Sequence, residues 1–382
     1  MFRQSFLLSC LVFALACASV VRAQQTPAAP VLAAKSWVLV EFGSGQVLAS
    51  HAPDERLEPA SLTKLMTAYL TFSALRQKNL GLADTVTISE KAWRMGGSKM
   101  FIKAGDKVLV EDLIKGMVVQ SGNDASVALA EAIGGDEETF AGMMNREAAR
   151  LGMKSTRFRN ATGMPDPEHR TTARDLSLLA TALIRDFPQE YARYYSIREF
   201  RYSNISQLNR NRLLWMDASV DGIKTGSTES AGFCLVASAR RNGRRLLSVV
   251  LGTGSDAARA QESLKLLNWG YQARDAIRLY AAGQPVSSFK VWKGSASTVK
   301  AGFLPRDFIV SVPKGHGDRL RATLVSRQPL LAPVRQGQAI GIMRLTLDDR
   351  AYGEYPVLAL ETVAVGNWFR RFIDTVRLWF SR

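Results

Sequence analysis

Asn242-Gly243 is the strongest short turn signal in this chain of 382 residues. It lies between two apolar runs, GFCLVASARR and RRLLSVVLG. An Asn-Gly pair in that setting predicts a β-hairpin, because both residues readily adopt positive φ. A second pair of strands is predicted in SWVLVEFGSGQVLAS, around Gly43-Ser44-Gly45. Two strand pairs at the two ends of one segment restrict it to folds in which both ends meet on an antiparallel sheet.

Helical patterns fill the segment between these strands. Apolar residues recur at helical spacing over 65–72, over 110–133 with an interruption at QSGNDAS, over 137–151 and over 172–184. After the Asn-Gly hairpin, ARAQESLKLLNWGYQAR predicts a closing helix. The order of two strands, a helical block, three strands and a helix predicts an α+β domain over residues 35–282.

The pattern changes around residues 281–285. From 287 to 363 the chain consists of short alternating runs separated by Gly, Pro and Asp, which is typical of a small β-sandwich. We therefore expect a second, all-β domain over residues 283–364.

Residues 365–382 predict an amphipathic helix. Its apolar stripe consists of Trp368, Phe369, Phe372, Ile373, Val376, Trp379 and Phe380. Most of its charges lie opposite, at Arg370, Arg371, Asp374, Arg377 and Arg382. Aromatic side chains beside arginines suit the headgroup zone of an anionic membrane, so residues 368–382 are expected to anchor there. Docking on the protein's own core and a dimer seam are the alternatives.

Residues 1–23 have the pattern of a secretory signal peptide, and 24–34 that of a linker. Lipid attachment at Cys17 is an alternative for this segment. Cleavage after residue 23 leaves Cys234 as the only thiol, so no internal disulfide is expected.

The formal net charge is +16, and it falls to +14 when Arg3 and Arg22 leave with the signal peptide. This excess favours anionic partners. Nucleic acid is not expected, because the chain is exported and shows no nucleic-acid-binding signature. An anionic lipid surface or an acidic polymer outside the cytoplasm fits better, and a basic surface without a specific partner is the alternative.

Three short motifs follow one another along the first domain: Ser61-Leu62-Thr63-Lys64, Ser121-Gly122-Asn123 and Lys224-Thr225-Gly226. Taken singly they could be a helix cap at Ser61, a turn and the start of a strand. Taken together they suggest a nucleophile and its base, because Lys64 lies one helical turn from Ser61.

A lysine can take the serine proton only when it is neutral, and its ordinary pKa of about 10.4 must therefore be lowered. Partial burial and a second cation, Lys224, would both lower it. His51, His169 and His316 are not well placed to serve instead. No cluster of His, Cys and Glu has the spacing of metal ligands, so no metal or other cofactor is expected.

The three motifs resemble those of the serine penicillin-recognising enzymes. Longer blocks resemble the DD-carboxypeptidases of the type of penicillin-binding proteins five and six: MFIKAGDKVLVEDLIKGMVVQSGNDASVALAE, HRTTARDLSLLA, NRNRLLW, VDGIKTGSTESAGFCLVASA and ESLKLLNWG. The resemblance runs from residue 35 to 271, and the trailing β domain and amphipathic helix match that family too.

This resemblance implies an enzyme that removes the terminal D-alanine from peptidoglycan stem peptides and is acylated by penicillins. Ser61 would form the acyl-enzyme and Lys64 would be the base. Ser121 would pass protons to the leaving group, and Asn123 would hold Lys64 and the substrate amide. The protein would lie in the periplasm, on the outer face of the cytoplasmic membrane.

The resemblance also implies how substrate is held. The backbone N–H groups of Ser61 and Ser227 would form the oxyanion hole, and Thr225 and Gly226 would lie on an edge strand that the peptide extends. Two arginines would bind the terminal carboxylate, and the matching positions are Arg210 and Arg259. The chain departs from the family at Ser227, where His is frequent, so we expect an altered rate or pH profile with the chemistry retained.

Three other functions are alternatives. A class A β-lactamase shares the motifs but needs a Glu-x-x-Leu-Asn loop, which the sequence lacks, and it would end soon after Trp269. A DD-endopeptidase that cuts peptide cross-links uses the same chemistry and stays open. A non-catalytic module that binds peptidoglycan or senses β-lactams would not need Ser61 and Lys64.

Overall fold

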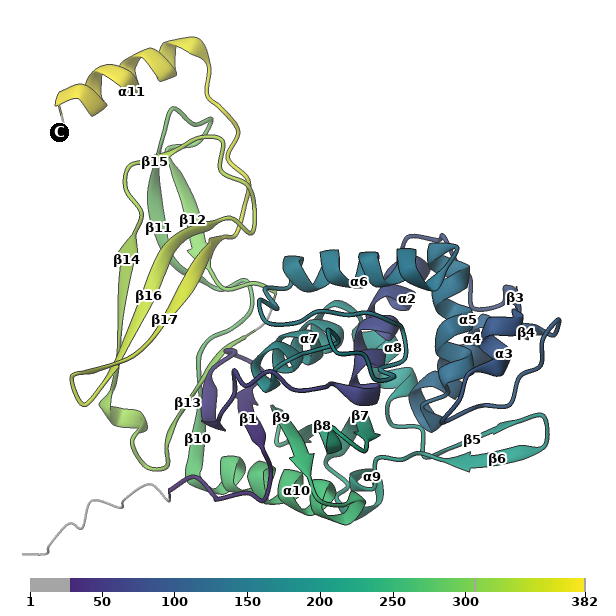
Figure 1. Cartoon of the computed structure of the whole chain (residues 1–382). Coiled ribbons are helices and arrows are strands. Elements are labelled where there is room, and N and C mark those ends of the chain that lie inside the picture. The colour runs from purple at the N-terminus through teal and green to yellow at the C-terminus, as the bar shows by residue number, and fades with distance from the viewer. Residues whose placement is uncertain (1–27, 306, 381–382) are drawn as a thin grey trace, which may run out of the picture.

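The computed structural model describes residues 28–305 and 307–380. The predicted signal peptide lies outside these residues. Figure 1 shows two bodies, an α+β domain and an elongated β domain, with the helix α11 (Trp368–Phe380) at the tip far from the first domain. Within the described ranges, no helix is long and apolar enough to cross a membrane.

The first domain is built on a five-stranded antiparallel sheet with the strand order β2-β1-β9-β8-β7. Its strands are β1 (Ser36–Glu41), β2 (Val47–His51), β7 (Val220–Thr228), β8 (Gly232–Arg241) and β9 (Arg244–Thr253). Because β1 pairs with β9, the two ends of the domain meet on one sheet, and the α+β prediction is confirmed.

The predicted Asn-Gly hairpin joins β8 to β9. Asn242 has a φ of 50° and Gly243 a φ of 79°, and Arg241 pairs with Arg244 across the turn. Two consecutive positive φ values match the right-handed twist of the flanking strands. The turn therefore sets the register of the two central strands.

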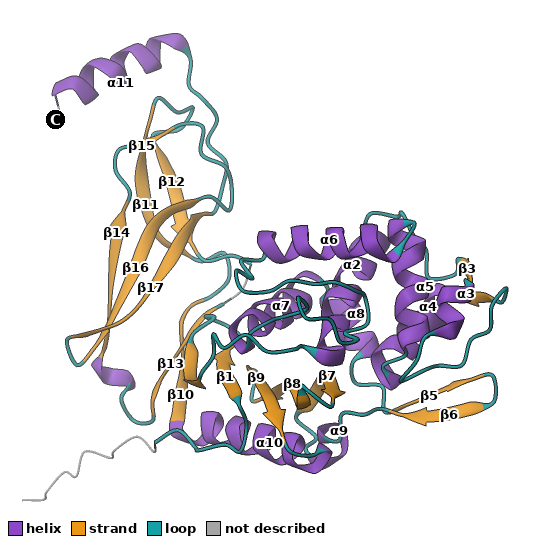
Figure 2. Cartoon of the chain, viewed as in Figure 1, coloured by secondary structure: helices purple, strands orange, loops and turns teal. Residues whose placement is uncertain are grey.

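Helices cover both faces of this sheet (Figure 2). Trp37 and Leu39 of β1 pack with the apolar side chains of α10 (Asp256–Ala273), whereas Val38 and Val40 pack with the helical block on the other face. Successive side chains of a strand point to opposite faces, so a strand buried on both sides is apolar throughout. This explains the continuous apolar runs around the hairpin.

The helical block consists of α2 (Lys64–Arg76), α3 (Glu90–Arg94), α4 (Val110–Lys115), α5 (Asn123–Gly134), α6 (Glu137–Arg150), α7 (Ala173–Asp186) and α8 (Pro188–Tyr194). A 3₁₀ turn, η1 (Ala60–Thr63), precedes α2. A single turn of π-helix, η2 (Gly116–Gln120), separates α4 from α5. The remaining elements of this domain are α9 (Leu213–Met216) and two small hairpins, β3 (Thr85–Thr87) with β4 (Lys107–Leu109) and β5 (Glu199–Tyr202) with β6 (Ile205–Leu208).

The second domain is all-β. A six-stranded sheet has the order β14-β16-β17-β12-β11-β15, and β10 pairs with β13 beside it. The strands are β10 (Arg274–Tyr280), β11 (Pro285–Trp292), β12 (Thr298–Gly302), β13 (Phe308–Pro313), β14 (Leu320–Ser326), β15 (Leu330–Leu331), β16 (Ala339–Leu347) and β17 (Arg350–Ala359), with a 3₁₀ turn, η3 (Gly317–Arg319), before β14. Since β10 pairs with β13 and packs on this domain's core, residues 274–280 lie with the second body, ahead of the expected boundary at 283.

Arg244 ties the two bodies together. Its guanidinium donates to the Glu41 carboxylate at 2.7 Å, to the carbonyls of Gly270 and Arg274 at 3.2 and 3.0 Å, and to the Ser311 hydroxyl at 2.8 Å. Burial raises the pKa of the Glu41 carboxyl, and Arg244 opposes that rise. The pair is buried, so each charge depends on the other.

Replacing this arginine tests the junction. We expect Arg244→Met to lower the free energy of unfolding by about 3 kcal/mol, because it leaves the Glu41 carboxylate buried without a partner. Urea unfolding followed by tryptophan fluorescence measures the change. Adding Glu41→Gln to this variant should recover part of the loss.

Arg344→Met is the matched control, because the Arg344–Glu354 pair has a similar separation of 2.8 Å but both side chains are more than half exposed. The free energy of unfolding of this control variant should fall by no more than about 1 kcal/mol. Equal losses in the two variants would contradict a special role for the buried pair.

Candidate active site

Ser61 lies inside the 3₁₀ turn η1 that leads into α2. The N-cap positions of η1 and α2 are Pro59 and Thr63, and neither makes a side-chain cap. The alternative that Ser61 is a helix cap is therefore wrong. Ala60 has a φ of 47°, a left-handed conformation unusual for alanine, and Ser61 follows it half-buried at the start of the helix.

Lys64 occupies the centre of the site. Its ammonium nitrogen lies 3.0 Å from the Ser61 hydroxyl, 2.7 Å from Oδ1 of Asn123 and 2.7 Å from the carbonyl oxygen of Thr162. A neutral amine has two N–H groups and one lone pair. When Asn123 and Thr162 accept both hydrogens, the lone pair faces the Ser61 hydroxyl, which can then donate to it.

Burial, and after it the positive charge of Arg210, lower the pKa of Lys64 to about 7, while Asp124 opposes the shift. The side chain is 1% exposed, so its charged form loses almost all hydration. Asp124 is held by the backbone N–H groups of Met100, Phe101 and Ala125. The expected lowering of the pKa by burial is present, but the cation that adds to it is Arg210 and not Lys224.

Ser121 ends the π-turn η2 in a left-handed conformation with a φ of 67°. Its hydroxyl accepts a hydrogen bond from Lys224 at 2.9 Å, and Lys224 also donates to the carbonyl of Thr225 at 2.8 Å. Burial and the charge of Lys64 hold the pKa of Lys224 well below its ordinary value. The predicted break in the helical block therefore brings Ser121 against the third motif.

Asn123 opens α5 and joins three segments. Its Oδ1 accepts from Lys64, and its Nδ2 donates to the carbonyl of Gly96 at 2.7 Å. The second hydrogen of Nδ2 has only the sulfur of Met164, at 3.6 Å. A thioether is a weak acceptor, so this hydrogen can be given up to a better one.

Lys224, Thr225 and Gly226 lie within β7, at the edge of the sheet. The motif is in the middle of the strand, four residues after its start at Val220, and not at the strand start. A Cβ on Gly226 would come within 3.1 Å of the Ser61 nitrogen and 3.0 Å of the Pro59 carbonyl oxygen. Glycine is needed because β7 and the turn η1 approach that closely.

Arg259 reaches β7 from α10. Its NH1 donates to the carbonyl of Gly226 at 3.2 Å, and its NH2 contacts the Asp256 carboxylate. The C=O and N–H of a trans peptide point in opposite directions. With the Gly226 carbonyl held by Arg259, the N–H of Ser227 therefore points away from α10.

Arg210 lies on the loop after β6 and is exposed. It is near enough to Lys64, Lys224 and Arg259 to lower the pKa of each. Among the described residues it has no hydrogen bond or ion pair. All ten predicted site residues thus gather around Lys64 and β7, with Arg210 free and Arg259 partly engaged.

The sequence did not predict the contribution of residues 159–170. Asn160 accepts from the backbone nitrogens of Thr162 and Gly163 and shapes the turn that presents the Thr162 carbonyl. A Cβ on Gly163 would lie 1.7 Å from the Ala60 carbonyl oxygen. The Asn-x-Thr-Gly pattern indicates such a turn, but no side chain identifies a carbonyl as a partner of Lys64.

His169, from the same segment, contacts Thr63 at 2.9 Å and not Ser61. Burial lowers the pKa of its imidazole to about 4, so the ring is neutral at pH 7. Its place is consistent with the expectation that no histidine serves as the base.

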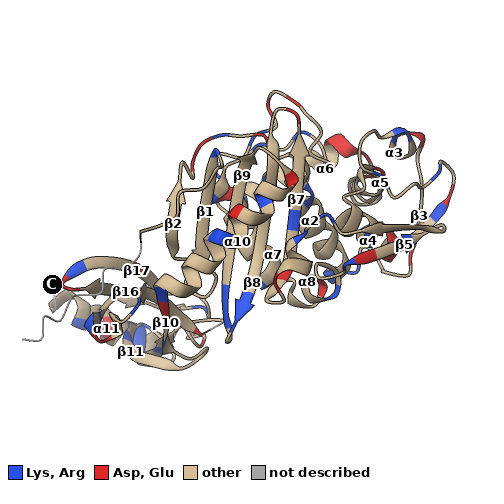
Figure 3. Cartoon of the chain, turned by 90° about the horizontal axis from the view of Figure 1, so that it is seen from below, with Lys and Arg blue, Asp and Glu red and all other residues tan. Residues whose placement is uncertain are grey.

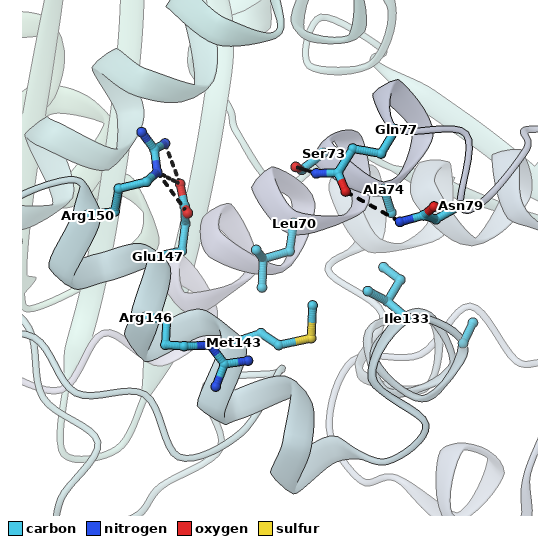
Figure 4. Close-up of a pocket in the computed structure, with 11 residues that line it drawn as sticks. Leu70, Ser73, Ala74, Gln77, Asn79, Ile133, Met143, Arg146, Glu147 and Arg150 are labelled. Carbon is cyan, nitrogen blue, oxygen red and sulfur yellow. Dashed lines mark hydrogen bonds and ion pairs between the residues drawn. The ribbon is translucent and has the colours of Figure 1, made fainter.

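A separate pocket lies away from this cluster, between the C-terminal half of α2 and the helices α5 and α6 (Figure 4). It encloses about 390 Å³, and Leu70, Ile133, Met143 and Arg146 are among the residues that line it. None of the residues that surround Lys64 lines this pocket.

Known proteins resemble this chain over almost its whole length. Residues 23–255 match the family described as D-alanyl-D-alanine carboxypeptidase, and residues 275–365 match the C-terminal domain of penicillin-binding protein 5. The D-alanyl-D-alanine carboxypeptidase DacC of Escherichia coli is 41% identical over 368 residues, which are 94% of this chain and 92% of that protein.

Two solved structures extend the comparison. Penicillin-binding protein 5 from Haemophilus influenzae is 38% identical and superposes with a TM-score of 0.79, covering 88% of this chain and 99% of that one. The ampicillin-bound form of penicillin-binding protein D2 from Listeria monocytogenes is 30% identical, with a TM-score of 0.59. The match covers 63% of this chain and 98% of that one. The chain therefore belongs to the D-alanyl-D-alanine carboxypeptidase family.

Proposed function

We propose that this protein is a serine D-alanyl-D-alanine carboxypeptidase that removes the terminal D-alanine from peptidoglycan stem pentapeptides. The observation that carries the proposal is the place of Lys64, whose amine is buried between two acceptors and 3.0 Å from the Ser61 hydroxyl. The names of the relatives support the substrate class.

In the first step the Ser61 oxygen attacks the carbonyl of the penultimate D-alanine, and its proton passes to Lys64. The backbone N–H groups of Ser61 and Ser227 receive the negative oxygen of the tetrahedral intermediate. When the C–N bond breaks, the leaving amine takes a proton from the chain formed by Lys64, Ser121 and Lys224. A water molecule then cleaves the ester and restores the Ser61 hydroxyl.

Substrate would lie along β7, because an edge strand has unpaired backbone groups that an extended peptide can use. Thr225 and Gly226 would line it, and a substrate carbonyl would replace the Met164 sulfur as the partner of Asn123. Arg210 would bind the terminal carboxylate. Arg259, engaged with Gly226, would contribute positive charge from behind the strand.

Penicillins would acylate the same serine. The ampicillin-bound structure of the Listeria protein supports this, because that protein shares the fold of the first domain. Mass spectrometry of peptidoglycan fragments tests the substrate: loss of one alanine from pentapeptides supports a carboxypeptidase, and cleavage of cross-linked dimers would show an endopeptidase instead.

We further propose that the exported protein attaches to the outer face of the cytoplasmic membrane through α11. Six large apolar side chains of this helix are exposed: Trp368, Phe369, Phe372, Val376, Trp379 and Phe380. Its other side contacts the β domain, where Asp374 accepts from the Lys293 backbone nitrogen at 2.6 Å and Arg370 donates to the Ser295 carbonyl. Lys and Arg segments occur across both domains, interspersed with Asp and Glu (Figure 3), so the membrane proposal rests on α11 itself.

Fluorescent penicillin tests the nucleophile. The wild-type protein should become covalently labelled, and Ser61→Ala should not, because it lacks the attacking oxygen. Ser73→Ala, on the helix α2 that follows Ser61, is the matched control and should label normally. An unlabelled wild type would refute the acyl-enzyme proposal.

The pH dependence of acylation tests the base. Lys64 is protonated below its pKa of about 7, so the acylation rate should fall as the pH drops through 7 and level off above it. Arg210→Gln removes a nearby cation, which should raise the pKa of Lys64 and move the acidic limb to higher pH. A rate that is independent of pH between about 5 and 9 would contradict Lys64 as the base.

Vesicle binding tests the anchor. Deletion of residues 368–382 should abolish sedimentation with anionic vesicles and keep activity on soluble peptides. Phe372→Glu should weaken binding, whereas Leu208→Glu should not, although the two side chains are similarly exposed at 64% and 62%. Vesicle binding that survives the deletion would refute this proposal.

A further inference from the structure

Glu58, three residues before the nucleophile, joins two segments that are distant in sequence. One of its carboxylate oxygens accepts from Arg170 at 2.8 Å, and the other accepts from the hydroxyl of Ser230. Its side chain is only 16% exposed. Both carboxylate oxygens are therefore hydrogen-bonded to groups of the protein that lie 112 and 172 residues away in the sequence.

The Arg170 side of this bridge belongs to the segment that holds Lys64. Leu57 and Thr171 form a β-bridge, so the backbone beside Glu58 is already paired with the backbone beside Arg170. The same segment supplies the Thr162 carbonyl to Lys64. The Glu58–Arg170 pair thus connects the residues just before Ser61 to the segment whose Thr162 carbonyl binds Lys64.

The Ser230 side belongs to the turn that follows β7. Within β7, the peptide between Gly226 and Ser227 is held at its carbonyl end by Arg259. Gly226 also packs against the Ser61 nitrogen. β7 stays paired with β8 through Ser227, opposite Phe233, and Thr228, opposite Gly232. The Ser230–Glu58 hydrogen bond adds a tie from the turn of this hairpin to the segment just before Ser61.

We propose that Glu58 is a positioning residue that, through Ser230, fixes the Ser227 N–H relative to the Ser61 N–H. This inference rests on the proposed function, in which these two donors form the oxyanion hole. The donors act in the transition state, where the oxygen becomes negative, and much less on the ground-state carbonyl. Loosening one donor should therefore slow acylation and leave initial binding of penicillin unchanged.

The experiment measures penicillin acylation of the full chain by stopped flow, separating the binding constant from the acylation rate constant. Loss of one oxyanion donor typically lowers the catalytic rate constant about 10²–10³-fold, so a displaced donor should lower the acylation rate constant about 10-fold. We expect Ser230→Ala and Glu58→Gln each to show this loss, and the double variant to be no slower than the slower single variant. Ser230→Thr keeps the hydroxyl and should restore the rate.

Asp54→Asn is the matched control. Asp54 precedes Glu58 by four residues and makes an ion pair with Arg174, with contacts of 2.6 and 2.9 Å, on the exposed side of the same segment. This variant should acylate at the wild-type rate. Thermal unfolding of every variant shows whether a loss of rate follows a loss of stability.

The outcomes separate the two proposals. If the wild type is not acylated at Ser61, the proposed function itself fails. If the wild type is acylated and Ser230→Ala reacts at the wild-type rate, or changes only the binding constant, the role of Glu58 is refuted. If the fold-losses in acylation rate of the two single variants multiply in the double variant, Glu58 does not act through Ser230 and the proposal is likewise refuted.

Discussion

The buried amine of Lys64 is the interaction on which the site depends. Taking an ammonium group out of water is unfavourable, so burial favours the neutral amine. The two acceptors around it can bind the N–H groups of either the neutral or the charged form. Asn123 and Thr162 come from segments 59 and 98 residues away, so the amine is placed only when the helical block and the 159–170 segment are both folded. The placement of the amine beside Ser61 is thus a property of the whole first domain.

Unusual backbone conformations surround this amine. Ala60 and Ser121 have φ values of 47° and 67°, and Gly163 is in contact with the Ala60 carbonyl. Left-handed conformations cost energy for residues other than glycine and persist where packing holds them. Here the packing of β7 and of the 159–170 segment on both sides of the nucleophile turn does so, and it points the hydroxyls of Ser61 and Ser121 toward the two lysines.

Features encoded by local pattern could be predicted from the sequence. Asn242-Gly243 has one favourable turn geometry, and the interruption at QSGNDAS marks the place where Ser121 breaks the helical block. Features that depend on backbone groups or on distant partners could not. The Thr162 carbonyl carries no side-chain signal, and the engagement of Arg259 with the Gly226 carbonyl follows from how α10 packs on the sheet. A cap at Ser61 was an alternative because caps and nucleophiles can occupy the same end of a helix.

The cluster of cations explains how Lys64 could serve both as a base and as a store of the proton. In the free protein the charge of Arg210 helps to lower the pKa of Lys64, which keeps the amine neutral and ready. In the proposed function the terminal carboxylate of the substrate binds Arg210 and cancels that charge. The pKa of Lys64 then rises while Ser61 is losing its proton, so the amine becomes a stronger acceptor at the moment of attack. A substrate without the carboxylate would lack this assistance, and selectivity for a free chain end would follow from electrostatics as well as from fit.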